Sequence, residues 1–270
     1  GIRGGFPTIL NDLNGGKVYY IYSRKHGDME RDYNAFQMPN SYYSSGPGNF
    51  RDVNQNRRSD LCFYPFVGDY NIHQFFSLIQ ADGHNPLNVK PPVFSVADNF
   101  SSPLLDQCPD ELKNAIKPFL KRFEPSELFT LIVQKSAFSP AEAHRLFSHI
   151  LSHAKQEYAA NFAEGYWIDH WTYNTDLLEN YISLFPDKLD SLLFRDDYRY
   201  FYSTVYIEPR SEKYALLPDG RVRQYGAINL AKAKKDARER NLDLRQSAWL
   251  QDKYGHIVQT TLASKIFNLI

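Results

Sequence analysis

The chain has 270 residues, of which 43% are hydrophobic, and 31 basic side chains balance 31 acidic ones. This composition is typical of a globular protein with a packed core, and the balanced charge argues against nucleic acid as a partner. No apolar run approaches the roughly 18 residues that a membrane span needs, so we expect a cytoplasmic protein with no membrane partner.

The first part of the chain, residues 1–66, is expected to consist of strands and loops. Residues 17–22 form a β-rich run that follows a turn at residues 14–16. A long polar run, residues 48–60, lies in the same part of the chain. We therefore predict an N-terminal β/loop segment that carries this polar run.

The next segment predicts one helix and then a linker. Ile72, Phe75, Phe76 and Ile79 recur at helical spacing, and an Asp-Gly pair follows. Residues 84–108 contain four prolines and few periodic signals, which predicts a long ordered loop or a linker.

From residue 109 the pattern is helical. Pro125 and Pro140 each stand in a first helical turn and are followed by a glutamate, a typical helix start. An Asp-Gly pair at residues 219–220 predicts a β-hairpin. The predicted helices are residues 109–121, 125–134, 139–161, 172–185, 186–194 and 228–240, with two more short helices near the end.

A short β segment followed by many helices predicts a mainly α fold, either an (α/α)6 barrel or the N-terminal part of one. The expected division is residues 1–66 as the β/loop segment and residues 67–270 as the helical barrel part, with a helical insertion at about 109–162. The chain begins without Met and stops within an apolar helical pattern. We expect it to associate with the rest of a longer chain or with copies of itself.

The polar run offers the side chains that suit the hydroxyls of a sugar. A guanidinium can donate two hydrogen bonds to neighbouring hydroxyls, a carboxylate can accept from them, and carboxamides can do both. The alternative is a solvated loop in which arginine and aspartate pair with each other. The candidate substrate-binding residues are Arg51, Asp52, Asn54, Gln55, Asn56 and Arg57.

A second candidate group lies at residues 164–174 in an aromatic-rich chain, 15% of which is Phe, Tyr or Trp. Trp167, Trp171 and Tyr173 could stack on a sugar ring. Asp169 is a candidate general acid as well as a substrate-binding residue. The alternative is that Asp169 caps the following helix while both tryptophans belong to the core. No metal site is predicted, and Cys62 and Cys108 indicate neither a disulfide framework nor zinc.

The sequence Phe-Arg-Asp-Val-Asn-Gln at residues 50–55 closely resembles the Phe-Arg-Asp-x-Asn-Gln motif of the cellobiose and chitobiose phosphorylases, glycoside hydrolase family 94. The order of elements through residues 165–178 is also similar to that family. The resemblance implies an (α/α)6 barrel and inverting phosphorolysis of a β-glucosidic bond, with Arg51 and neighbouring acidic residues holding the donor sugar. Inorganic phosphate would be the co-substrate and no cofactor would be needed.

Two departures from the family pattern bear on this expectation. An acidic residue follows the motif glutamine in the family, whereas Asn56 and Arg57 follow it here. The general-acid motif Gly-Asp-Trp-Asn-Asp does not occur in the sequence. The sequence therefore leaves three functions open: a phosphorylase acting on a β-glucoside or oligosaccharide, an inverting hydrolase, and a non-catalytic carbohydrate-binding or scaffold subunit.

Overall fold

The computed structural model describes residues 5–10, 16–23, 38–163, 168–204, 208–224, 228–240 and 247–269. The chain divides into two compact units. One consists of Gly1–Tyr70 and Lys90–Ala159, and the other of Asn71–Val89 and Ala160–Ile270. Each unit therefore combines two segments that are distant in the sequence.

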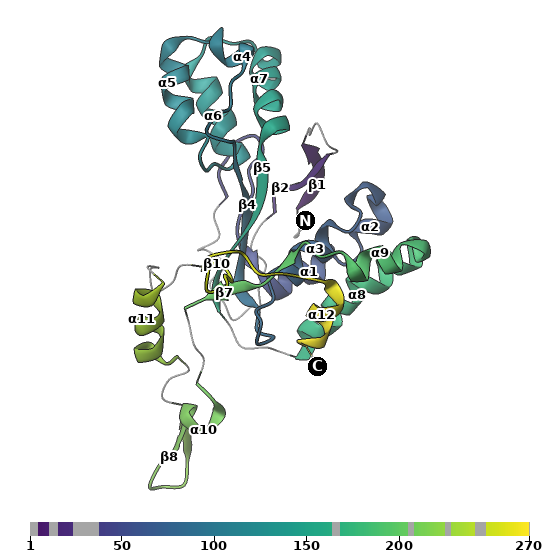
Figure 1. The fold of residues 1–270 in the computed structure, drawn as a ribbon, viewed down its shortest axis with the longest axis vertical. Coiled ribbons are helices and arrows are strands. Elements are labelled where there is room, and N and C mark those ends of the chain that lie inside the picture. The colour runs from purple at the N-terminus through teal and green to yellow at the C-terminus, as the bar shows by residue number, and fades with distance from the viewer. Residues whose placement is uncertain are drawn as a thin grey trace. The chain divides into compact units, whose positions relative to one another are not determined.

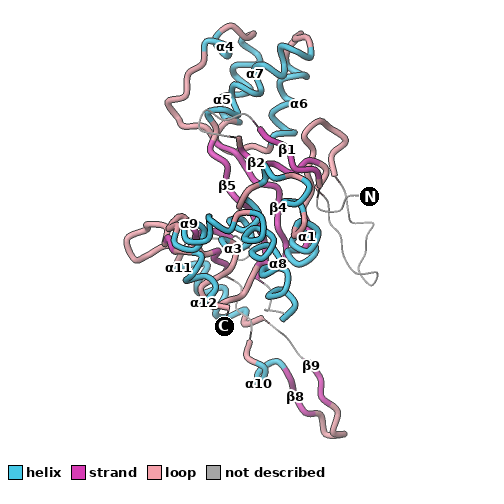
Figure 2. Tube along the Cα trace, turned by 90° about the vertical axis from the view of Figure 1, so that its right-hand side faces the viewer, coloured by secondary structure: helices cyan, strands magenta, loops and turns pink. Residues whose placement is uncertain are grey.

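Both helices and strands occur in several parts of the chain (Figure 2), so the fold is mixed α and β. The described strands form four antiparallel two-stranded sheets and one three-stranded sheet of order β3-β4-β5. The expected mainly α fold, an (α/α)6 barrel or its N-terminal part, is wrong for this chain. It was wrong because two segments expected to be a linker and the end of a helix are long strands that pair with each other.

These two strands are β4 (Pro86–Ser95) and β5 (Lys155–Ala163), and β3 (Gly48–Asn49) completes the sheet. β4 occupies much of the predicted linker, whose prolines hide a strand because proline cannot donate a ladder hydrogen bond. The helix predicted over residues 139–161 ends at His153, and Ala154 is already extended, with φ −81° and ψ 145°. Tertiary pairing, which a local pattern does not report, decides the structure of both segments.

Four helices lie together in the first unit (Figure 1), and their apolar faces supply most of its core. The predicted helices at residues 109–121 and 125–134 are confirmed. The helix predicted from residue 139 begins as expected, with Ser139 as its N-cap. The four are α4 (Pro103–Asp106), α5 (Asp110–Phe119), α6 (Pro125–Lys135) and α7 (Pro140–His153).

Strand β2 (Lys17–Ile21) pairs with β1 (Phe6–Leu10) in antiparallel register and is buried on both faces. Successive side chains of a strand point to opposite faces. Tyr19 therefore joins the helical core, with its ring centroid 6.0 Å from that of Phe94. Tyr20 lies in a separate cluster with Val67.

A short helical region follows β3 in the same unit. It comprises α1 (Phe50–Arg57), α2 (Asp60–Phe63) and the 3-10 helix η2 (Pro65–Val67). The polar run was expected to lie among strands and loops, and this expectation is wrong for most of the run, because its central residues form α1. Val53 is the only β-branched residue in α1, and the bond from Asn56 Nδ2 to the main-chain oxygen of Asp52 ties two residues of low helix propensity into the helix.

The second unit contains the 17-residue helix α8, several shorter helices and three of the two-stranded sheets. β7 pairs with β10, β6 with β11, and β8 with β9. The predicted hairpin is confirmed: β8 and β9 flank Gly220, whose φ of +81° suits glycine. The remaining helices and strands are α3 (Tyr70–Ser77), α8 (Ile168–Leu184), η3 (Pro186–Lys188), α9 (Leu189–Phe194), β6 (Tyr198–Arg199), β7 (Phe201–Ser203), α10 (Arg210–Lys213), β8 (Tyr214–Leu216), β9 (Val222–Gln224), α11 (Leu230–Glu239), β10 (Ser247–Trp249), β11 (Gln259–Thr260) and α12 (Leu262–Phe267).

Several sequence expectations for this unit hold. α3 buries Ile72, Phe75 and Phe76, the helical set expected around residues 72–79. α8, η3 with α9, and α11 match the helices predicted at 172–185, 186–194 and 228–240 to within a few residues. Near the end, one described helix, α12, stands where two short helices were expected, and two strands precede it. In the described part of the chain, no helix is both long and apolar enough to cross a membrane.

Candidate functional site

The polar run is placed by helix α1. Asn49 is the N-cap, Asp52 stands in the first turn and Arg57 in the last, an order that complements the helix dipole. The carboxylate of Asp52 accepts a hydrogen bond from Asn49 Nδ2 at 3.0 Å, and the main-chain oxygen of Asp52 accepts one from Asn56 Nδ2 at 2.6 Å. Asp52 and Asn56 thus hold the motif helix in shape.

The motif side chains divide between two faces of α1. Asp52, Asn54 and Arg57 are buried, with exposed fractions of 7%, 0% and 5%. Arg51 is exposed and Gln55 is half-buried. Residues four apart lie on the same side of a helix, so Arg51 and Gln55 form the outward face of the motif. A ligand approaching α1 from solvent would meet this pair first.

The inward end of the motif is centred on Arg57. Its guanidinium carbon lies 3.7 Å from the centroid of the Tyr20 ring, a cation–π arrangement. Arg57 Nη2 also donates to the hydroxyl of Ser23 at 3.3 Å. The guanidinium is therefore committed to groups of its own unit, which fits a role in positioning α1 against β2.

Asp60, the first residue of α2, lies beside this arginine. Burial raises the pKa of Asp60 from 3.8 to about 6, while a hydrogen bond with Tyr20 and the charge of Arg57 act in the opposite direction. The Oδ2 atom of Asp60 is buried and has no hydrogen-bond partner among the described residues. Asp60 is thus a carboxyl group that exchanges its proton close to neutral pH.

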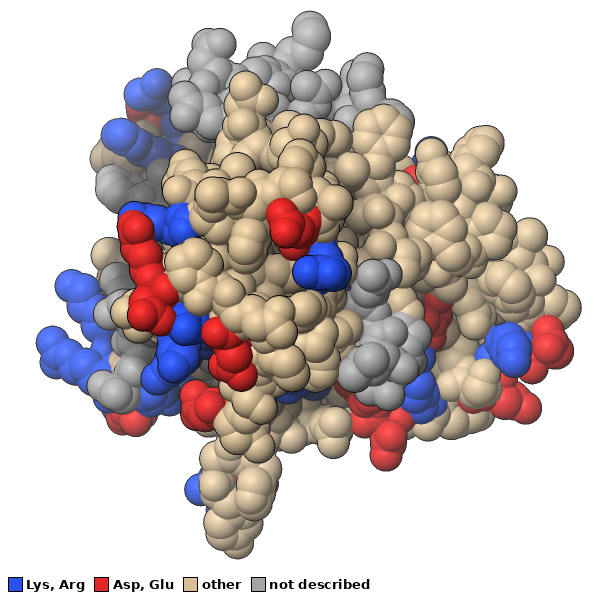
Figure 3. All heavy atoms as spheres, turned by 90° about the horizontal axis from the view of Figure 1, so that it is seen from above, with Lys and Arg blue, Asp and Glu red and all other residues tan. Residues whose placement is uncertain are grey.

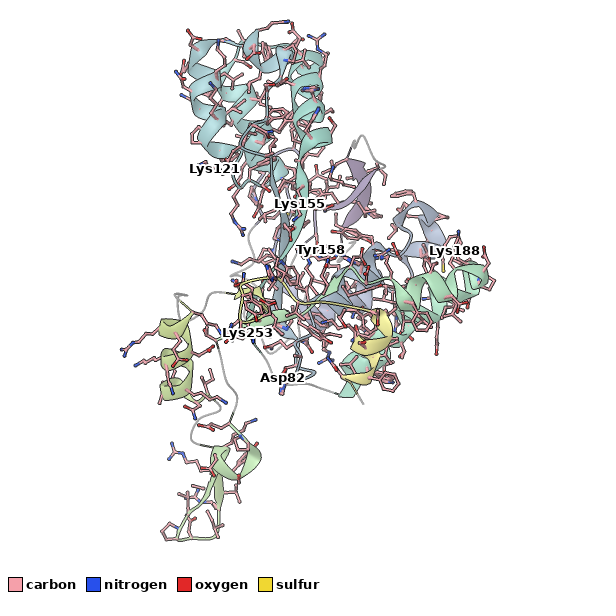
Figure 4. The ribbon with its side chains drawn as sticks, viewed as in Figure 1. Asp82, Lys121, Lys155, Tyr158, Lys188 and Lys253 are labelled. Carbon is pink, nitrogen blue, oxygen red and sulfur yellow. The ribbon has the colours of Figure 1, made fainter. Side chains whose placement is uncertain are left out.

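Strand β5 adds polar and aromatic groups to the same place. Gln156 Nε2 donates to the hydroxyl of Tyr70 at 3.3 Å and to the main-chain oxygen of Val18 at 2.9 Å. The ring of Tyr158, labelled on β5 in Figure 4, lies 5.8 Å from that of Tyr70 in an edge-on arrangement. Burial raises the pKa of Tyr70, so its hydroxyl stays protonated at neutral pH.

We call Tyr20, Arg57, Asp60, Tyr70 and Gln156 the Tyr20 cluster. Four of these residues lie outside the set predicted to bind substrate, and only Arg57 was in it. Asp60 could have been found, because it ends the same polar run and follows Arg57 by three residues. Tyr20, Tyr70 and Gln156 could not be predicted from the residues around them, because they lie outside α1 in the sequence and only the tertiary fold brings them to it.

Glu124 is a second carboxyl group of this unit that titrates near neutrality. Burial, and then the charge of Glu127, raises its pKa to about 7. Glu124 is the N-cap of α6, and its main-chain N–H donates to the carboxylate of Glu127 at 3.1 Å. This arrangement is a capping box, so a structural role accounts for it.

The second predicted group belongs to the other unit. Trp167 lies outside the described residues. Asp169 lies in the first turn of α8, and nothing is described of its side chain. Trp171 and Tyr173 are half-buried on α8. The structure thus places three of these four residues on one helix and the α1 motif in a different unit.

Two comparisons bear on identity. The sequence matches no protein-family model, and a search of curated proteins found no match. In the described part of the chain, no group of three or more His, Cys, Asp or Glu side chains is arranged to hold a metal ion.

Proposed function

We propose that the chain binds the donor sugar of a β-glucoside or oligosaccharide through the outward face of α1, as part of an inverting phosphorylase that uses inorganic phosphate. The resemblance of residues 50–55 to the family 94 motif supports this activity. The observation that carries the proposal is the exposure of Arg51 beside Gln55 on a helix whose other motif residues are buried. This arrangement places an exposed arginine and a half-buried glutamine on one side of a firmly held helix.

The chemistry of these two groups suits a sugar. A guanidinium presents a rigid fork of donors that spans two neighbouring hydroxyls, and a carboxamide both donates and accepts. The buried groups behind them fix the direction of the helix, so little conformational entropy of the helix is lost when a sugar binds. We also propose a cytoplasmic location, which the two free thiols of Cys62 and Cys108 support.

The first test is sugar binding by an Arg51→Ala variant. We expect its affinity for glucose or cellobiose, measured by isothermal titration calorimetry, to fall about tenfold or more, because a charged hydrogen-bond donor is lost. Stability should change by less than about 0.5 kcal/mol, because Arg51 is exposed and alanine favours a helix. Arg145→Ala is the matched control, because Arg145 is an exposed arginine on α7.

The second test separates catalysis from binding. The chain is incubated with glucose 1-phosphate and a series of β-glucosyl acceptors, and released phosphate is measured. Phosphate release that Arg51→Ala suppresses supports a phosphorylase. Sugar binding without phosphate release, and without hydrolysis of cellobiose, would favour a non-catalytic carbohydrate-binding subunit. Unchanged affinity in Arg51→Ala would place the sugar elsewhere and contradict the proposal.

A further inference from the structure

In the second unit, the short helix α12 carries a lysine that is completely buried. Lys265 has an exposed fraction of 0%, and its Nζ donates to the main-chain oxygen of Ile79 at 2.5 Å. The same Nζ lies 3.7 Å from the centroid of the Tyr200 ring. Thr261 caps the helix by accepting from the N–H of Ser264 at 3.2 Å.

The end of α12 also approaches the same turn closely. Gly83 has φ +82°, and a Cβ added there would lie 2.6 Å from the main-chain oxygen of Asn268. The turn itself is closed by a hydrogen bond from Gln80 N to His84 O at 2.7 Å. α12 therefore docks on residues 79–83 at two points, Lys265 and Asn268.

Among the described residues, no carboxylate compensates the charge of Lys265. No described residue forms an ion pair with Lys265, and burial alone lowers its pKa well below 10.5. Titratable side chains near α12 include Asp190 on α9, Asp82 and His84 in the turn, and Tyr200, whose ring lies beside the amine. Asp82 and His84 pair with each other, at 3.3 Å between His84 Nδ1 and Asp82 Oδ1.

We propose that Lys265 makes the docking of α12 sensitive to pH, so that the helix is held on residues 79–83 at alkaline pH and is released as the pH falls. The amine of released Lys265 is in water and keeps its proton up to about pH 10.5, whereas the docked amine loses its proton at a lower pH. Release is therefore coupled to proton uptake. Between the docked and released pKa values, the equilibrium constant for release rises up to about tenfold for each pH unit lost.

The test follows the lysine and the helix separately. NMR of protein labelled with ¹³C at lysine Cε gives the titration of Lys265 directly, with its signal assigned by its absence in Lys265→Met. Amide hydrogen exchange of residues 262–269, corrected for the intrinsic effect of pH, reports release. We expect Lys265 to titrate well below the other lysines and exchange of α12 to speed up as the pH falls from about 10 to 7.

Lys265→Met keeps an unbranched side chain and removes the charge, so exchange of α12 should become slower and independent of pH. Lys253→Met is the matched control, because Lys253 also lies over a tyrosine ring, 4.9 Å from the centroid of Tyr254, but is exposed. His84→Gln should leave the pH dependence of α12 exchange unchanged. That result would show that the dependence comes from Lys265 and not from the Asp82–His84 pair. A wild-type Lys265 signal that titrates with the other lysines would overturn the proposal, whether or not the variant folds.

Discussion

At the scale of single residues, Asp60 illustrates how burial changes the chemistry of a carboxyl group. Tyr20 and Arg57 both favour its charged form, yet burial outweighs them and raises its pKa to about 6. The result is an acid whose pKa lies nearer to neutral pH than that of an ordinary aspartate. Such groups are common in sites that move protons, although structural networks also produce them.

The raised pKa of Asp60 has a consequence for stability. The unfolded chain releases this proton near pH 4 and the folded chain near pH 6, so the folded state binds more protons between these values. Raising the pH through this interval therefore destabilises the fold, on the order of 2 kcal/mol. Asp60→Asn should remove this loss of stability at higher pH. The free energy of unfolding in urea is measured for variant and wild type at about pH 4.5 and 7, and the difference between the two proteins should change between these pH values.

The control for this experiment is Asp98→Asn, because Asp98 lies exposed in a loop of the same unit. Its unfolding free energy should follow that of the wild type at both pH values. If Asp60→Asn and wild type keep the same difference at both pH values, Asp60 titrates normally and its surroundings are more hydrated than the structure indicates.

At the scale of elements, the ends of helices were the most predictable features. The Ser-Pro-x-Glu sequence before α7 forms a capping box, in which Ser139 N donates to Glu142 Oε2 at 2.8 Å and Ser139 Oγ accepts from Glu142 N at 3.4 Å. These contacts span three residues and need no partner elsewhere in the fold. A local pattern is therefore enough to predict them.

Removing this cap should weaken the first unit. We expect Ser139→Ala to lower the free energy of unfolding by about 1 kcal/mol, measured by urea denaturation, because the N-terminal N–H groups of α7 lose an acceptor. Ser183→Ala is the control. Ser183 is an exposed serine inside α8 whose hydroxyl bonds back to Glu179 O, so its loss should be neutral or slightly stabilising.

Strands β4 and β5 show what local patterns could not supply. The prolines of β4 were interpreted as a linker, and β5 continues directly from the helical pattern of α7. Both strands owe their structure to a pairing between segments that are at least 60 positions apart in the chain, from Ser95 to Lys155. The candidate site follows the same division. Arg51 and Asp60 stand out in the sequence, whereas Tyr20, Tyr70 and Gln156 reach α1 only through the tertiary fold.

At the scale of the whole molecule, the charges cancel. The 31 basic and 31 acidic side chains give a calculated isoelectric point of 7.2. On the face shown in Figure 3, both signs of charge are present among larger uncharged areas. The mutual repulsion that keeps proteins apart in solution is therefore smallest near neutral pH.

This balance predicts a solubility minimum close to pH 7.2, with higher solubility at about pH 5 and pH 9. Precipitation by polyethylene glycol across this range measures the effect. A Lys234→Glu variant on the exposed side of α11 carries a formal charge of −2 and should shift the minimum to lower pH. Solubility that rises or falls steadily across the range would mean that exposed apolar side chains, not charge, control association.

Strand β2 has a consequence for how the sequence can change over time. Tyr19 packs in the helical core and Tyr20 packs in the cluster on the opposite face, so both faces of the strand are buried. Inserting or deleting one residue within Lys17–Ile21 would exchange the two environments. Tyr20, which lies against Arg57, would then point toward the helical core. Relatives of this chain should therefore vary in length outside β2 and keep its five positions uninterrupted.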